Sequence, residues 1–176
     1  MAYGIGLVFD HQAEAQIREV WHALARLGFA TPLGRPGCLP HVSLMLSEAL
    51  QVEELARDVE ALGLSLCSLE VRFSYVGLFT EPETVLFYGL TPTDGLLRLH
   101  ADMERTYRRR SSPIMARTES GVWVPHCTLA GRVDAGRVSE AIAAAATLAL
   151  PWQANEVRLA IVQFDQLRVE LLKVFP

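Results

Sequence analysis

Apolar and polar positions alternate along this chain in a way that predicts short strands interleaved with amphipathic helices. The apolar run from Ile5 to Phe9 stops at Asp10 and suits a strand. After it, apolar residues recur at helical spacing as far as Leu27, and Gly28 fits the end of that helix. The same pattern predicts strands near residues 3–9, 65–79, 84–90, 157–164 and 167–174, and helices near residues 12–27, 52–62, 93–109 and 135–148.

One five-residue motif occurs twice within this pattern. The first copy is Pro40-His41-Val42-Ser43-Leu44, after a loop rich in Gly and Pro at residues 31–37. The second is Pro125-His126-Cys127-Thr128-Leu129, after a predicted loop at residues 111–120. Each copy reads proline, histidine, apolar residue, hydroxyl residue, leucine. A matched pair favours a shared function over two unrelated structural histidines.

On a strand, the histidine and the hydroxyl of each copy point to the same side, because residues two apart share a face. His41 and Ser43 would then lie roughly 7 Å apart on one face, as would His126 and Thr128. The apolar residue and the leucine of each copy would face a core. Each copy therefore predicts half of an active site.

Two such halves suit in-line displacement at phosphorus. Histidine has an ordinary pKa of about 6.5, so one ring can accept a proton from the attacking oxygen while the other donates one to the departing oxygen. Two hydroxyls can donate hydrogen bonds to the non-bridging phosphate oxygens. The scheme needs no metal ion and no cofactor.

These motifs resemble the paired His-x-Ser/Thr-apolar signature of the 2H phosphoesterases, and within them the bacterial 2'-5' RNA ligase-like or 2',3'-cyclic phosphodiesterase branch. The stretch at residues 76–79, the strand at 85–90 and the helix around 96–100 also look like the middle section of that family. The resemblance implies that His41 and His126 act as general base and acid, and that Ser43 and Thr128 hold the phosphate.

The order of elements hints at an internal duplication, with one motif in each half. We expect an α+β fold of two pseudo-symmetric lobes, each a mainly antiparallel sheet with helices on its outer face, around a central cleft. The resemblance implies the same architecture. No linker rich in Ser or Gly separates the halves, so residues 1–176 are expected to form a single bilobal domain.

Composition fits an enzyme of modest size. The 176 residues are 51% hydrophobic and carry a formal net charge of −4, which argues against a protein that coats long nucleic acid. Three cysteines without a C-x-x-C pair favour neither disulfides nor structural zinc, so we expect a cytoplasmic protein. No segment looks like a signal peptide or a membrane span. We expect a monomer without an obligate protein partner.

Several other residues are weaker candidates for substrate binding. Arg132 lies four residues past Thr128 and would share its face if the strand stayed regular, unless Gly131 ends the strand first. The arginines at positions 105 and 108–110 fit the end of a helix better than a polyanion site. His11, His22 and His100 are expected to be structural or solvated. Candidates for an aromatic platform under a base are Phe79, Phe87, Tyr88 and Phe164, whereas Trp123 is expected in the core.

The predicted function is metal-independent opening of a 2',3'-cyclic phosphate, on an RNA end or a nucleotide, to a phosphomonoester. The family resemblance suggests a 2'-phosphate product. Alternatives using the same side chains are 2'-5' RNA ligation, 2'-5' phosphodiester cleavage and action on a cyclic phosphate of another metabolite. A non-catalytic module that binds RNA ends is an alternative of a different class.

Overall fold

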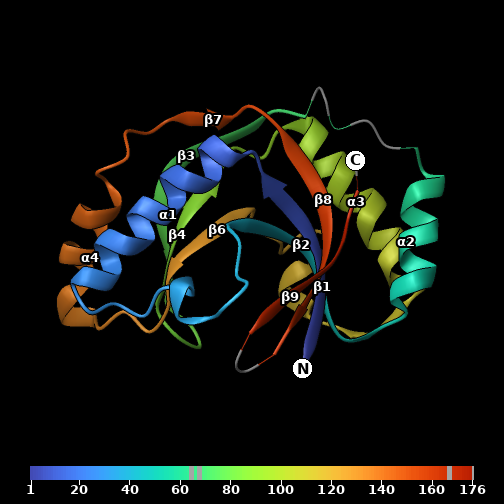
Figure 1. The fold of residues 1–176 in the computed structure, drawn as a ribbon, viewed down its shortest axis with the longest axis horizontal. Coiled ribbons are helices and arrows are strands. Elements are labelled where there is room, and N and C mark those ends of the chain that lie inside the picture. Colours follow the sequence, from blue (N-terminus) through green and yellow to red (C-terminus); the bar gives the residue numbers. More distant parts are fainter. Residues whose placement is uncertain (64–65, 67–68, 166–167, 176) are drawn as a thin grey trace.

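Two antiparallel sheets lie next to each other between two pairs of helices in the computed structural model, which describes residues 1–63, 66, 69–165 and 168–175 (Figure 1). The first sheet contains, in order, β5 (Ser111–Ile114), β2 (His41–Leu50), β1 (Ala2–Phe9), β8 (Val157–Phe164) and β9 (Val169–Val174). The second contains β6 (His126–Ala130), β4 (Val85–Leu90), β3 (Val71–Phe79) and β7 (Trp152–Ala154). The α+β class with two antiparallel sheets confirms the predicted fold.

The helices cover the outer faces of the sheets, as predicted. The pair α1 (His11–Arg26) and α4 (Val138–Ala145) covers the second sheet, and the pair α2 (Val52–Ala61) and α3 (Asp94–Arg108) covers the first (Figure 1). Short 3-10 turns lie in the connections between these elements: η1 (Pro32–Gly34), η2 (Ala116–Thr118) and η3 (Ala135–Arg137). Within the described residues, no helix combines the length and the apolar character required to cross a membrane.

Two helices cross between the lobes. α1 follows β1 of the first sheet, yet its Trp21 indole donates to the carbonyl of Thr128 in the second sheet, at 3.0 Å. α3 follows β4 of the second sheet, yet the hydroxyl of its Tyr107 donates to the carbonyl of Tyr3 in the first sheet, at 3.0 Å. The final strands β8 and β9 also return to the first sheet. The two lobes are therefore interleaved along the chain rather than formed by its two halves.

The sequence placed most elements within a few residues of their observed bounds, with three differences. The predicted loop at 111–120 is wrong, because it contains β5, which pairs with the second half of β2, and η2. The predicted helix at 135–148 is shorter and begins with η3, and β7 was not predicted. The predicted strand starts at 65 and 167, and Cys67, lie outside the described residues.

Candidate active site

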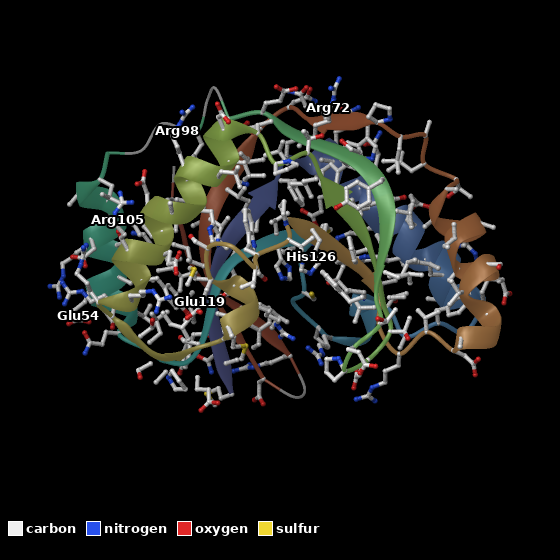
Figure 2. The ribbon with its side chains drawn as sticks, turned by 180° about the vertical axis from the view of Figure 1, so that it is seen from behind. Glu54, Arg72, Arg98, Arg105, Glu119 and His126 are labelled. Atoms are coloured by element: carbon white, nitrogen blue, oxygen red, sulfur yellow. The ribbon has the colours of Figure 1, made fainter. Side chains whose placement is uncertain are left out.

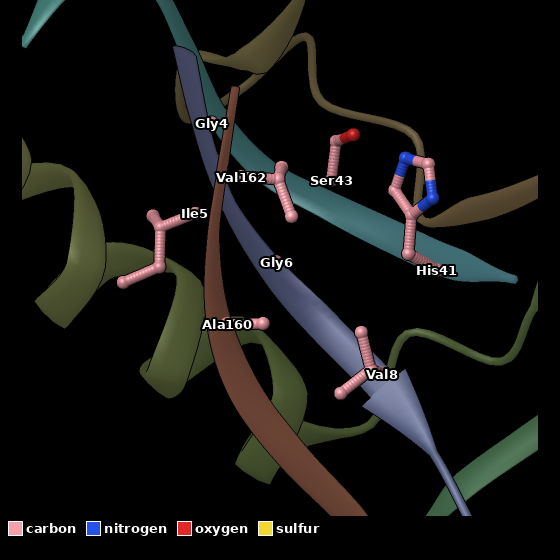
Figure 3. Close-up of a pocket in the computed structure, with 8 residues that line it drawn as sticks. All are labelled: Gly4, Ile5, Gly6, Val8, His41, Ser43, Ala160 and Val162. Atoms are coloured by element: carbon pink, nitrogen blue, oxygen red, sulfur yellow. The ribbon is translucent and has the colours of Figure 1, made fainter. Parts of the chain in front are cut away.

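Both motifs begin strands whose side chains alternate as the sequence predicts. Val42 and Leu44 are fully buried, as is Leu129, and Cys127 is only 1% exposed, because these residues face the two cores. The histidine and the hydroxyl residue of each motif lie on the opposite face and are half-buried. In Figure 3, the side chains of His41 and Ser43 point to the same side of β2.

The two imidazoles are held by matching hydrogen bonds. The Nδ1 of His41 lies 2.7 Å from the carbonyl oxygen of Leu39, and the Nδ1 of His126 lies 2.7 Å from that of Val124. A carbonyl only accepts, so each Nδ1 carries the proton and donates. The proline before each histidine favours an extended backbone at the preceding residue, which places that carbonyl beside the ring. The Nε2 atoms remain the ones available for chemistry.

Two tryptophans hold the hydroxyl segments of the motifs by their free strand edges. β5 pairs only with the second half of β2, which leaves the motif half without a partner strand on that side, and β6 is the edge strand of its sheet. The Trp123 indole Nε1 donates to the carbonyl of Ser43 at 2.9 Å, and the Trp21 indole Nε1 donates to that of Thr128 at 3.0 Å. Each tryptophan therefore satisfies an edge carbonyl that would otherwise need water.

The motif strands β2 and β6 contact each other across the two sheets. Burial raises the pKa of the Cys127 thiol to about 12, and the backbone N–H of His41, which lies against its sulfur, opposes this shift. Cys127 thus joins the second motif to the first residue of β2. It is a buried small group, as expected, and not a nucleophile.

Burial lowers the pKa of both motif histidines. For His41 the backbone hydrogen bond to Leu39 partly opposes this effect. For His126 the bond to Val124 opposes it, while the nearby charges of His41 and Arg117 lower the pKa further. The two rings are therefore close enough that a proton on one disfavours a proton on the other. Two groups that interact in this way titrate as a pair rather than independently.

The two motif hydroxyls are free to bind a ligand. Within the described part of the chain, neither Ser43 Oγ nor Thr128 Oγ1 forms a hydrogen bond. A hydroxyl on the same face as a half-buried imidazole, with no competing protein acceptor, can donate to a phosphate oxygen.

A shallow hollow lies in front of His41 and Ser43 (Figure 3). Its floor comes from β1 and β8, where small residues leave the space open: Gly4, Gly6, Val8, Ala160 and Val162. A second hollow beside His41 is lined by residues from β1, β8, β9 and the loop before β2. The first sheet therefore offers an apolar recess next to its motif.

Aromatic rings surround His126 instead. The Phe79 and Phe87 rings stack on each other at 4.4 Å between centroids. Both rings lie edge-to-face with the His126 imidazole, with ring centroids 4.8 and 5.2 Å apart. His126 lies between the helix pairs in Figure 2. On the other side, the Phe164 ring lies 5.7 Å from that of His41. Three of the four predicted platform residues are thus next to a motif histidine.

The fourth candidate, Tyr88, does not bind substrate as predicted, because it is buried in the core. Its residue pairs with Cys127 and shares the core face of β4, and its side chain is fully buried. The hydroxyl donates to the carbonyl of Ala145 at the end of α4, at 2.6 Å. Tyr88 therefore joins the second sheet to its covering helix and does not reach the motif face.

Arg132 is also not where a regular strand would place it. β6 ends at Ala130, and the backbone N–H of Gly131 donates to the carbonyl of Ala30. Arg132 itself has a φ of 53° and pairs with Glu83 at 3.3 Å, with 79% of its side chain exposed. Of the two alternatives for this position, the structure supports the one in which the strand ends before Arg132.

The other basic and histidine candidates have structural surroundings. Arg108 pairs with Glu104 and Glu119, and Arg110 pairs with Asp58, so these arginines tie α3 to its neighbours. His100 is buried, its Nε2 donates to the carbonyl of Thr118 at 2.9 Å, and its ring stacks on Trp123 at 4.0 Å. Among the residues that the structure describes, no three His, Cys, Asp or Glu side chains gather as a metal ion would require.

The sequence analysis did not predict that Trp21 and Trp123 hold the motifs, and it expected Trp123 in the core. Trp21 is indeed buried, and Trp123 is partly buried against the core, but both also donate to the motifs. These two bonds depend on which strand edges the fold leaves unpaired, and the sequence pattern did not predict the short strand β5 beside β2. It also missed Arg117, whose charge acts on His126.

Two interleaved α+β lobes, each with a strand carrying His-x-Ser/Thr on its half-buried face, define the two-histidine class of protein that the sequence resembles. The sequence pattern of the 2'-5' RNA ligase superfamily matches residues 9–167 of this chain. The chain therefore belongs to this superfamily of 2H phosphoesterases.

Solved structures agree on the fold. TT0787 of Thermus thermophilus is 21% identical, with a TM-score of 0.64, and the match covers 99% of this chain and 97% of that one. E. coli LigT in its complex with 3'-AMP is 18% identical, with a TM-score of 0.58 and coverage of 99% and 98%. LigT complexed with phosphate is 18% identical, with a TM-score of 0.55 and coverage of 98% and 94%. A comparison with curated proteins found no match.

Proposed function

We propose that the protein is a metal-independent phosphoesterase that opens a 2',3'-cyclic phosphate on an RNA end or a nucleotide. Membership of the superfamily supports phosphoesterase or RNA ligase-like chemistry. The observation that carries the finer proposal is the matched pair of imidazoles, each donating from Nδ1 to a backbone carbonyl at 2.7 Å. This arrangement fixes the tautomer of both rings and leaves both Nε2 atoms for proton transfer.

The reaction uses four side chains in two equivalent positions. The Nε2 of one histidine accepts a proton from water as the water oxygen bonds to phosphorus. The P–O bond to one ribose oxygen breaks, and the Nε2–H of the other histidine protonates that oxygen. Ser43 and Thr128 donate hydrogen bonds to the non-bridging oxygens throughout. The product is a phosphomonoester, in our proposal the 2'-phosphate.

Ligand chemistry in a protein of the same fold is compatible with this proposal. E. coli LigT is described in complexes with phosphate and with 3'-AMP. Those ligands contain the phosphate and the nucleoside that the proposed substrate combines. An RNA end would bring further phosphates to the site, whereas a cyclic nucleotide brings only one.

The test is turnover of 2',3'-cyclic AMP in the presence and absence of a chelator. We expect full activity with the chelator, and a loss of at least about 100-fold in His41→Ala and in His126→Ala. His22→Ala, an exposed histidine on α1, is the matched control and should keep full activity. Activity abolished by the chelator, or kept in either motif variant, contradicts the proposal. Phosphorus NMR of the product identifies the oxygen that carries the phosphate.

Ligation is the second candidate, because the superfamily is named after 2'-5' RNA ligase. It follows the same steps with a 5'-hydroxyl in place of water: the 5'-oxygen bonds to phosphorus, the bond from phosphorus to the 3'-oxygen breaks, and the 3'-oxygen is protonated, which leaves a 2'-5' link. The test incubates the protein with two RNAs, one with a 2',3'-cyclic phosphate end and one with a 5'-hydroxyl. The product distinguishes ligation from hydrolysis. A joined product that contains a 2'-5' bond favours ligation. Unjoined RNA with a phosphomonoester end favours hydrolysis.

A further inference from the structure

Tyr75 stands in line with His126 across the second sheet. In the strand register Tyr75 pairs with Gly89, and Gly89 pairs with His126. Directly paired residues on antiparallel strands project to the same face, so Tyr75 shares the motif face with His126. Two strand spacings separate them, which is roughly 9–10 Å. That distance suits the base of a nucleoside whose phosphate is held at His126.

A shift in strand register turns Tyr75 toward this face. Phe73, two residues earlier, is fully buried in the core, and a regular strand would bury Tyr75 beside it. The pairing of β3 with β4 shifts between Phe73 and Tyr75. Irregularities of this kind commonly re-aim side chains next to active sites. Tyr75 is 44% exposed as a result.

The Tyr75 ring packs directly against the backbone of Gly89. A Cβ atom at Gly89 would lie 2.1 Å from Cζ of Tyr75 and 2.3 Å from Cε2, so the ring covers the glycine backbone directly. The edge of the ring meets Phe87, at 6.3 Å between centroids and 73° between planes. One face of the ring is thus held by the protein, and the exposed area of the side chain lies on the other.

The other aromatic residues at the site lack this combination. Phe87 is only 4% exposed, and Phe79 stacks on it. Phe164 lies on the opposite side, beside His41, where the hollow is lined by small apolar residues. Among the described aromatic residues near His126, Tyr75 has the most exposed ring.

We propose that the Tyr75 ring stacks on the base of the nucleoside whose phosphate lies between the two motifs. The inference rests on the proposed function and makes its substrate class a nucleoside cyclic phosphate rather than a cyclic phosphate without a base. Stacking tolerates any base, because each has a π face. Tyr75 therefore contributes to binding without selecting a sequence.

The test compares Tyr75→Ala, Tyr75→Phe and Phe164→Ala with the parent protein on two substrates. One is 2',3'-cyclic AMP, and the other is methyl riboside 2',3'-cyclic phosphate, which has a methoxy group in place of the base. We expect Tyr75→Ala to raise KM for cyclic AMP roughly 10- to 100-fold while kcat stays within about twofold. Tyr75→Phe keeps the ring and should match the parent. Neither of the two Tyr75 variants should change KM for methyl riboside 2',3'-cyclic phosphate.

Several results would overturn this assignment. An equal effect of Tyr75→Ala on both substrates, an effect on kcat alone, or a larger KM change in Phe164→Ala would each place the base elsewhere. Leu97→Ala, which removes a side chain of similar exposure on α3, is the control for general damage. If the parent opens no cyclic phosphate, the proposed function fails, and titration with adenosine 2'-phosphate still tests Tyr75. Equal affinity of parent and Tyr75→Ala in that titration contradicts the stacking role.

Discussion

The indole Nε1 of Trp123 donates to the carbonyl oxygen of Ser43 at 2.9 Å, and this bond ties the segment before one motif to the middle of the other. Trp123 is itself fixed by the stacked ring of His100, 4.0 Å away, whose Nε2 donates to Thr118. His100, a buried histidine outside the two motifs, thus supports the tryptophan that holds the backbone at Ser43. Trp21 holds Thr128 in the same way from α1.

Replacing Trp123 with Phe should impair turnover more than folding. The ring would keep its stacking on His100, but the carbonyl of Ser43 would lose its donor. We expect a loss of about 1 kcal/mol in the free energy of unfolding and a fall in kcat of roughly tenfold, because the hydroxyl of Ser43, which we propose to bind the phosphate, shifts. Urea unfolding and steady-state kinetics measure the two effects. Turnover equal to that of the parent would show that the bond does not position Ser43.

The sequence was sufficient to predict the motif strands because their alternation is local. Val42 and Leu44 are apolar, His41 and Ser43 are polar, and a strand converts that order directly into two faces. The helices at residues 12–27 and 52–62 were likewise set by local periodicity and by glycines that fit their ends. The roles of the four motif side chains stay a prediction.

Long-range relations were beyond the sequence. Nothing in β1 or α1 alone shows that α1 packs on the other sheet, because its apolar stripe fits either one. The register shift near Tyr75 depends on how β3 meets β4, and strict alternation from Phe73 would bury it. The position of Arg132 was open for a similar reason, since the pattern could not decide whether Gly131 ends the strand.

Gly6 should be intolerant of any side chain. A Cβ atom there would lie 2.5 Å from the backbone oxygen of Val42, inside the first motif, and backbone cannot move aside as a flexible side chain can. We expect Gly6→Ala to lower the free energy of unfolding by about 1–3 kcal/mol and to reduce kcat.

Gly34→Ala is the matched control, because an added Cβ meets no atom within 4 Å there. Its free energy of unfolding should equal or slightly exceed that of the parent, by less than about 1 kcal/mol. Urea midpoints of the two variants measure the difference. Equal stability of the two variants would show that β1 can move away from the motif strand.

Arg117 should control the protonation of His126. Burial is the main cause of the lowered pKa of His126, and the positive charges of His41 and Arg117 lower it further. Removing one of those charges in Arg117→Gln should raise that pKa toward its ordinary value and move the corresponding limb of the pH-rate profile to higher pH. Proton NMR titration of the His126 ring measures the shift, with Arg98→Gln as the control on α3. An unchanged titration would show that Arg117 is screened by solvent.

The folded protein should lose stability as the pH falls below about 6.5. Burial lowers the pKa of His41, His100 and His126 in the folded state, while the unfolded chain keeps the ordinary value of 6.5. Between the two values the unfolded state binds more protons, so the free energy of unfolding falls with decreasing pH, by up to about 1.4 kcal/mol per pH unit for each ring. Urea midpoints at pH 7.5 and 5.5 measure the fall, which should be smaller in His41→Asn/His126→Asn and unchanged in His22→Ala. A midpoint that does not change with pH, or equal falls in the double variant and the parent, would show that these rings are not held neutral by the fold.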